Sequence, residues 1–165
     1  MVNLKKKNDV AVMVSNEALT ALNWFGIQAT SGDNGEIRYN DVVRWIYDAL
    51  YRMNVECDFV WPESEDLSQY KAIFVPALYA APDSTLERLN QYVKDGGTLV
   101  VTFKSGFANE NVKVHADAQP HILKAALGIS YDQFTFPHNV KLSGKLYGAE
   151  SLDDFARSAD ADINS

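Results

Sequence analysis

The sequence is organised around residues 70–102, which read YKAIFVPALYAAPDSTLERLNQYVKDGGTLVVT. Residues 72–75 form a short apolar run, and residues 98–101 form a second run rich in β-branched side chains. Between them, the S-x-x-E spacing from Ser84 to Glu87 is that of a capping box, and apolar side chains then recur at helical spacing. Strand, crossover helix and second strand form a right-handed parallel pair in nearly all proteins. The segment therefore predicts one complete parallel strand–helix–strand unit.

The end of this helix is marked as clearly as its start. Lys94 falls in the last turn, where a cation interacts favourably with the helix dipole. Gly96 or Gly97 can then adopt the left-handed conformation that ends many helices. We interpret the glycine pair as a helix cap and not as a phosphate-binding loop.

Strands and helices also alternate on both sides of this unit. Residues 9–14 are a continuous apolar run, which is typical of a buried parallel strand, and residues 55–60 alternate as a strand does. A loose edge strand is predicted at residues 129–136. The fold class is therefore α/β, a three-layer αβα open parallel sheet with the flavodoxin-like strand order 2-1-3-4-5.

Two further helices complete the predicted layers. Asn40 is a plausible N-cap for a helix whose apolar face runs from Val42 to Met53 and which Asn54 ends. Residues 15–30 show no clean period and are interpreted as a long loop or a short helix, followed by a turn at residues 31–35. Near the end of the chain, the predicted helix starts at Pro120 and is capped by Gly128.

Size and charge limit the possible functions. The chain has 165 residues, enough for one domain with a substantial core. Its net charge of −7 argues against partners such as nucleic acid or anionic membranes, which favour basic patches. A single cysteine, Cys57, suits a reducing compartment, and neither a signal peptide nor an apolar run long enough to span a membrane is predicted.

Ligands of open parallel sheets gather where the strands end, so these positions are the candidate sites. They are Ser15 to Glu17, residues 76–79 and residues 103–106. The loop after the first strand has no glycine, and Glu17 would repel a phosphate, which argues against a flavin. The sequence also has no G-x-G-x-x-G fingerprint and no P-loop.

No catalytic set stands out among the reactive side chains. Cys57 lies inside a predicted strand, where a thiol is usually an inert small hydrophobe, and the sharp turn at residues 102–106 contains no cysteine. Ser105 is the next candidate nucleophile, but it lacks the G-x-S-x-G context of a nucleophile elbow. Three histidines, His115, His121 and His138, lie downstream of Ser105, and Asp117 is near them in sequence. Their spacing selects no partner for Ser105 and matches no metal motif, so we interpret the histidines as surface residues.

The sequence is also rich in aromatic residues, with three Trp, eight Tyr and eight Phe. Most of them are expected in the core. Any exposed ones on the loops, for which Tyr79 and Phe107 are candidates, would be anchors of an interface.

Several blocks of the sequence are similar to those of one known family. They are DLSQYKAIFVPALY at residues 66–79 and LERLNQYVKDGGTLVVTFKSG at residues 86–106, extended by residues 47–60, 109–114 and 127–134. Together they cover about residues 9–140, most of the chain. On these blocks, the chain resembles the middle domain of glycoside hydrolase family 42 β-galactosidases.

The resemblance implies a class I glutamine amidotransferase-like sheet that lacks its nucleophile and serves as a trimerisation module. It also implies that a preceding (β/α)₈ barrel hydrolyses terminal β-D-galactosides and carries both catalytic glutamates. A chain of 165 residues has no room for a barrel of about 200 residues or more, so no catalytic, cofactor-binding or metal-binding residue is carried over. The partners implied are other copies of the chain, in a homotrimer, and the barrel of the parent β-galactosidase.

Two other functions stay open on the sequence. One is an amidotransferase-like hydrolase with Ser105 as an unusual nucleophile, and the other is a sugar-binding module that uses aromatic residues at 76–79 and 103–107. We expect the domain to span residues 9–140, to need no cofactor and to be cytoplasmic. Residues 1–8 and 141–165 are expected to be flexible or frayed tails.

Overall fold

The computed structural model describes residues 6–28 and 36–131, which belong to one compact unit. Its main sheet has four parallel strands in the order β4-β1-β5-β6: β4 (Cys57–Val60), β1 (Val10–Met13), β5 (Ala72–Val75) and β6 (Thr98–Val101). Numbered along the chain, these strands run 2-1-3-4, which matches the first four strands of the predicted order 2-1-3-4-5. β5 and β6 have the predicted bounds.

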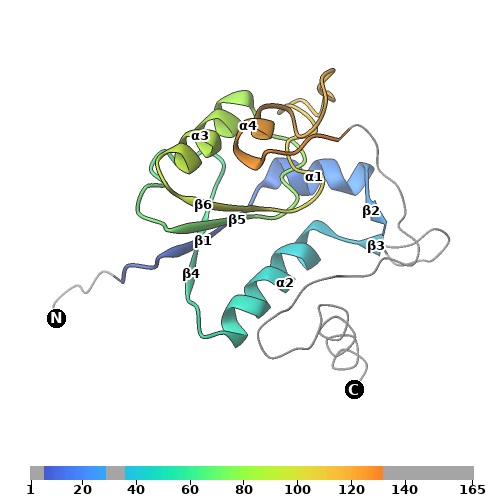
Figure 1. Cartoon of the computed structure of the whole chain (residues 1–165). Coiled ribbons are helices and arrows are strands. Elements are labelled where there is room, and N and C mark those ends of the chain that lie inside the picture. The colour runs from blue at the N-terminus through green and yellow to red at the C-terminus, as the bar shows by residue number, and fades with distance from the viewer. Residues whose placement is uncertain (1–5, 29–35, 132–165) are drawn as a thin grey trace, which may run out of the picture. The chain divides into compact units, whose positions relative to one another are not determined.

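Helices cover both faces of this sheet (Figure 1). The helix α2 (Tyr39–Arg52) lies on one face, and α3 (Asp83–Lys94) lies on the other with α4 (Lys124–Leu127) beside it. A short 3₁₀ helix, η1 (His121–Leu123), leads directly into α4. The helix α1 (Asn16–Trp24) follows β1 and contacts α2. The predicted three-layer α/β fold is therefore confirmed.

The largest part of the core is formed where α3 meets the sheet. Ile73 and Val75 of β5 are completely buried, as are Leu86 and Leu89 of α3, and all four belong to one hydrophobic cluster. Burying a side chain of this size contributes about 1.5–3 kcal/mol of stability. The strand–helix–strand unit that the sequence predicts is thus also the centre of the core.

The starts of three helices can be compared with the sequence. Ser15 caps α1, because its hydroxyl accepts a hydrogen bond from the Ala18 N–H at 3.1 Å. The predicted N-cap at Asn40 is wrong, since α2 begins at Tyr39 and its N-cap position is Arg38, two residues before Asn40. The predicted capping box at Ser84 is also wrong. Pro82 occupies the N-cap position of α3, which places Ser84 inside the first turn, where it cannot cap.

Helix ends and the smaller elements complete the description. Gly96 follows α3 with φ 96°, as the predicted left-handed cap requires, and Asn54, predicted to end α2, follows it with φ 58°. Two short antiparallel strands, β2 (Ile27–Gln28) and β3 (Glu36–Ile37), form a pair that the sequence does not predict.

Several predictions near the chain ends are tested only in part or not at all. Of the predicted edge strand, Tyr131 forms an isolated bridge with Gln119, and residues 132–136 lie outside the described part of the chain. The predicted turn at residues 31–35, most of the N-terminal tail and the whole C-terminal tail also lie outside it. No described helix has the length and apolar character needed to cross a membrane.

Candidate functional site

The polar side chains at the carboxyl ends of the strands hydrogen-bond to the backbone. After β1, the Ser15 N–H donates to the phenol oxygen of Tyr39 at 2.9 Å. After β5, the Ala77 N–H donates to the Thr102 hydroxyl at 2.7 Å, and the Leu78 N–H donates to the Ser105 hydroxyl at 3.0 Å. These hydroxyls satisfy buried amides, which would otherwise be costly. They hold the strand-end loops together.

Ser105, the candidate nucleophile, occupies a structural position. Its side chain is buried, and its oxygen is the acceptor for Leu78. An activated serine needs a general base within hydrogen-bond distance. Within residues 6–28 and 36–131, no hydrogen bond joins Ser105 to a histidine or a carboxylate. The hydrogen bond to Leu78 thus explains the presence of a serine at position 105 without a catalytic role.

Two sharp turns follow the central strands. Ala77 has φ 34° directly after β5, and Lys104 has φ 62° after β6. A nucleophile elbow presents its reactive side chain on a strained turn of this kind between a strand and a helix. The sequence predicts the second turn but not the first, at which Ala77 offers only a buried methyl group.

The environment of Cys57 favours the protonated thiol. Burial raises the pKa of the thiol, and the charge of the adjacent Asp58 raises it further. Because the thiolate is the nucleophilic form, a raised pKa lowers the reactivity of the side chain at neutral pH.

An aromatic cluster covers the strand ends; we call Phe25, Tyr79 and Phe107 the aromatic cap. The ring centroids of Tyr79 and Phe107 are 5.3 Å apart, and Phe25 lies within 6.2 Å of both. The ammonium of Lys104 lies 4.1 Å from the centroid of the Phe25 ring and donates to the Gly26 carbonyl at 2.8 Å. Burial lowers the pKa of Lys104.

The exposure of these rings differs from the prediction. Tyr79 is buried, so the expectation that it is an exposed interface anchor is wrong. The reason is tertiary, because the rings of Phe25 and Phe107 pack against it from other segments. The exposed members of this region are Phe25, its neighbour Trp24, which is 90% exposed, and Phe103.

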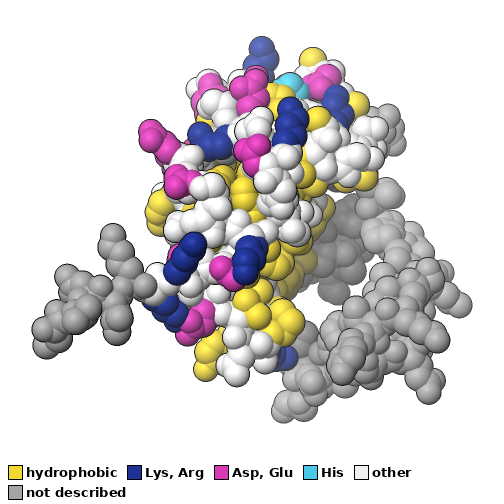
Figure 2. Space-filling view, turned by 60° about the vertical axis from the view of Figure 1, so that its left-hand side comes forward, with side chains coloured by type: hydrophobic (Ala, Val, Ile, Leu, Met, Phe, Trp, Pro, Cys, Tyr) yellow, Lys and Arg dark blue, Asp and Glu magenta, His cyan; other side chains and the backbone are white. Residues whose placement is uncertain are grey.

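A second aromatic cluster lies at α2 and β4; we call Tyr47, Tyr51 and Phe59 the α2–β4 aromatic surface. The Tyr47 ring stacks with Tyr51 at 6.4 Å and with Phe59 at 5.8 Å between centroids. All three side chains are exposed, and Tyr51 is 72% exposed. Figure 2 shows hydrophobic side chains at the surface in the lower part of the molecule, the level of α2 in Figure 1.

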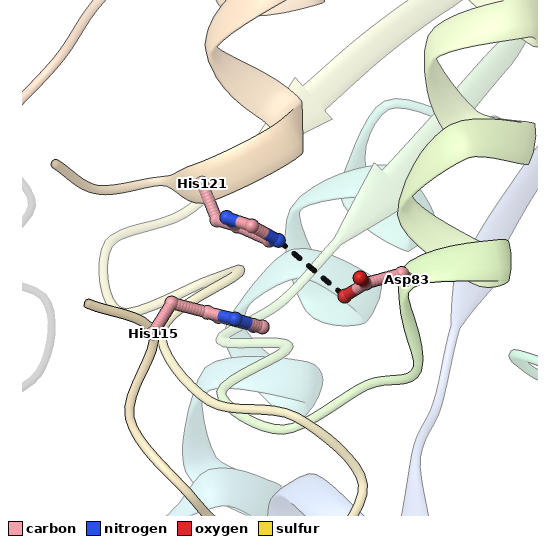
Figure 3. A group of neighbouring side chains, drawn as sticks. All are labelled: Asp83, His115 and His121. Atoms are coloured by element: carbon pink, nitrogen blue, oxygen red, sulfur yellow. Dashed lines mark ion pairs between the residues drawn. The ribbon is translucent and has the colours of Figure 1, made fainter. Parts of the chain in front are cut away.

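Two of the three histidines come together with acidic residues, although their spacing gives no sign of it. The rings of His115 and His121 stack with centroids 3.7 Å apart and 11° between their planes. Both rings point toward Asp83, at the start of α3 (Figure 3). The prediction that the histidines are separate surface residues is therefore wrong for this pair. His138 lies outside the described residues.

Asp117 fixes the orientation of His121. One oxygen of Asp117 is 2.6 Å from Nδ1 of His121, and the other accepts from the Lys124 ammonium at 2.6 Å. The hydrogen bond from Lys124 holds the pKa of Asp117 down to about 2, and the bond with His121 also lowers it. The carboxylate is therefore ionised at neutral pH and can accept a hydrogen bond from Nδ1–H of His121.

The other nitrogen of His121 faces Asp83. The Nε2 atom of His121 lies 3.4 Å from Oδ1 of Asp83. The Nε2 atom of His115 is buried and has no hydrogen-bond partner in the described part of the chain. Burial lowers the pKa of His115, and the neighbouring His121 lowers it further, so the neutral ring is favoured. A neutral imidazole can act as a metal ligand.

Comparison with known proteins identifies the family of this chain. The model of one family, the β-galactosidase trimerisation domain, matches residues 8–163. The chain belongs to this family. Its sequence is 34% identical over 160 residues to the β-galactosidase BgaB of Geobacillus sp. (strain Y412MC61). The aligned region covers 97% of this chain and 23% of that protein.

Solved structures of β-galactosidases share the fold of this chain. The chain is 31% identical to the β-galactosidase from Bacillus circulans sp. alkalophilus, with a TM-score of 0.69 over 90% of this chain and 20% of that one. For the β-galactosidase of the haloarchaeon Halorubrum lacusprofundi, the identity is 27% and the TM-score 0.68, over 85% and 21% of the two chains. The chain thus spans less than a quarter of the length of each of these three relatives.

Proposed function

We propose that this chain is the non-catalytic trimerisation module of a family 42 β-galactosidase. The observation that carries the proposal is the family match over residues 8–163, together with the small share of the relatives that the chain covers. The catalytic barrel would then lie in the remainder of the parent enzyme, where both catalytic glutamates are expected. The module would act indirectly, by holding barrels together in a homotrimer.

The strand ends support this proposal. In an amidotransferase-like hydrolase, a reactive side chain would occupy a strained turn and a base would lie beside it. Here the turn after β5 carries Ala77, and the Ser105 hydroxyl is bonded to a backbone amide. The likeness to glutamine amidotransferases and the domain bounds of residues 9–140 stay predictions, as does a cytoplasmic location, which the single cysteine favours.

The two aromatic regions suit the contact that a threefold axis requires. In a cyclic trimer, each contact is heterologous, so every subunit contributes two different surfaces. The α2–β4 aromatic surface and the exposed rings beside the aromatic cap are two such surfaces. Trp and Tyr are also the residues most often found as energetic anchors of interfaces. We therefore place Tyr51 of one subunit and Trp24 of the next in the same contact.

The test is the mass of the 165-residue chain in solution, measured by light scattering over a concentration series. A mass near three times 18.4 kDa is expected. Trp24→Glu and Tyr51→Glu should each abolish the trimer, because a buried carboxylate without a partner is strongly unfavourable. Glu87→Gln, at an exposed position of α3, is the matched control and should remain trimeric.

Mixing the two variants separates this arrangement from other kinds of contact. Each variant keeps one intact surface, so the mixture should form dimers through one wild-type contact but no closed trimer. A wild-type chain that stays monomeric at every concentration would contradict a self-sufficient interface. A trimer that survives both substitutions would show that other surfaces make the contact.

A further inference from the structure

We propose that Asp83, His115 and His121 bind a zinc ion that ties together three separate segments of the domain. Asp83 begins α3, His115 lies in the loop before η1, and His121 begins η1. One ligand atom from each residue lies within 4.8 Å of the other two. This site is independent of trimerisation and of any catalytic chemistry.

The donor atoms suit zinc. Two imidazole nitrogens and a carboxylate oxygen are a common set of three protein ligands, which leaves a fourth tetrahedral position for water. With metal–ligand distances of about 2.0–2.2 Å, ligand atoms of a tetrahedral zinc site lie roughly 3.3 Å apart. The Nε2 atom of His121 and Oδ1 of Asp83 are 3.4 Å apart, so this edge of the tetrahedron is already formed.

The surrounding residues prepare His121 as a ligand. Metal-bound histidines usually donate their other ring N–H to a carboxylate, which sets the tautomer and orients the ring. Asp117 does this for Nδ1 of His121 at 2.6 Å, leaving the lone pair of Nε2 directed toward Asp83 (Figure 3). His121 also has φ 51°, a left-handed conformation that is uncommon for a residue with a side chain.

His115 distinguishes a zinc site from an ordinary ion pair. A protonated His121 would form ion pairs with Asp83 and Asp117 without His115, although Nε2 of His121 has no hydrogen-bond partner in the described part of the chain. The buried Nε2 of His115 would still have no partner in the described part of the chain, whereas a zinc ion would satisfy it. The rings are nearly parallel, so His115 or His121 must rotate about its Cβ–Cγ bond before both lone pairs point at one ion.

The experiment is a calorimetric titration of the 165-residue chain with Zn²⁺ after metal has been removed by a chelator. One Zn²⁺ per chain is expected. A Zn²⁺ concentration one hundred times the Kd should raise Tm by roughly 5–10 °C, because the ion binds the folded state. Asp117→Asn should raise the Kd by roughly 10–100-fold, the usual effect of losing a carboxylate that supports a ligand.

Variants of the ligands show whether the ion binds where we place it. His115→Ala, His121→Ala and their combination should lose Zn²⁺ binding, while Asp48→Asn, an exposed carboxylate on α2, should bind as the wild type does. The far-ultraviolet circular dichroism and the Tm in chelator show whether each variant is folded. Absence of Zn²⁺ binding by the wild type would overturn the proposal, and so would binding that persists in the double histidine variant.

Discussion

Replacing Ser105 with alanine tests whether this residue is structural or catalytic. The side chain is 1% exposed, and its hydroxyl is the acceptor for the Leu78 N–H at 3.0 Å. Ser105→Ala leaves that buried amide unpaired, which costs about 1–3 kcal/mol. For a chain of this size, each kcal/mol corresponds to roughly 2–4 °C in Tm. We therefore expect a Tm about 5 °C lower, and a lower urea midpoint with an unchanged m value.

Ser84→Ala is the matched control for this substitution. Ser84 is exposed and lies within α3 without capping it, so its loss should change stability by less than about 0.5 kcal/mol. A Ser105→Ala protein as stable as the wild type would refute the structural role of the hydroxyl. If the chain hydrolyses an ester or a galactoside and Ser105→Ala removes that activity, the proposal of a non-catalytic module fails.

Two further substitutions test the packing and the pH dependence. A Cβ at Gly97 would overlap the ring of Tyr92, so Gly97→Ala should destabilise the domain by about 1–3 kcal/mol in urea unfolding. Gly26→Ala is the control and should destabilise it far less, because a Cβ at Gly26 would meet no atom closer than 3.9 Å. Burial raises the pKa of Tyr39 above its ordinary value of 10.0, so its neutral phenol stabilises the fold fully below pH 10, and this contribution is lost as the pH rises through the folded-state pKa. Tyr39→Phe should therefore lower stability at neutral pH, because the Ser15 N–H loses its acceptor. Above about pH 10, the stability of this variant should fall less with rising pH than that of the wild type, as measured by unfolding at a series of pH values.

The regular elements of this domain could be predicted from local sequence. Strands at residues 72–75 and 98–101 form where apolar and β-branched residues run together, and the helix between them follows the spacing of Leu86 and Leu89. Parallel pairing follows from chain handedness, which allows only one arrangement of such a unit. The starts of helices were less predictable. Pro82 occupies the N-cap position of α3, so the helix begins before Ser84 and the capping pattern falls inside it.

The sequence alone also showed that it lacks the familiar local motifs, because a phosphate-binding loop, a nucleophile elbow and a close-spaced metal motif all depend on neighbouring residues. Only the tertiary structure decided which distant residues meet. It buried Tyr79 under Phe25 and Phe107, and it bonded Ser105 to the amide of Leu78 across two loops. It also brought His115 and His121 beside Asp83. Those contacts join segments separated by up to tens of residues, so they depend on how the layers pack and leave no periodic or spacing signal along the chain.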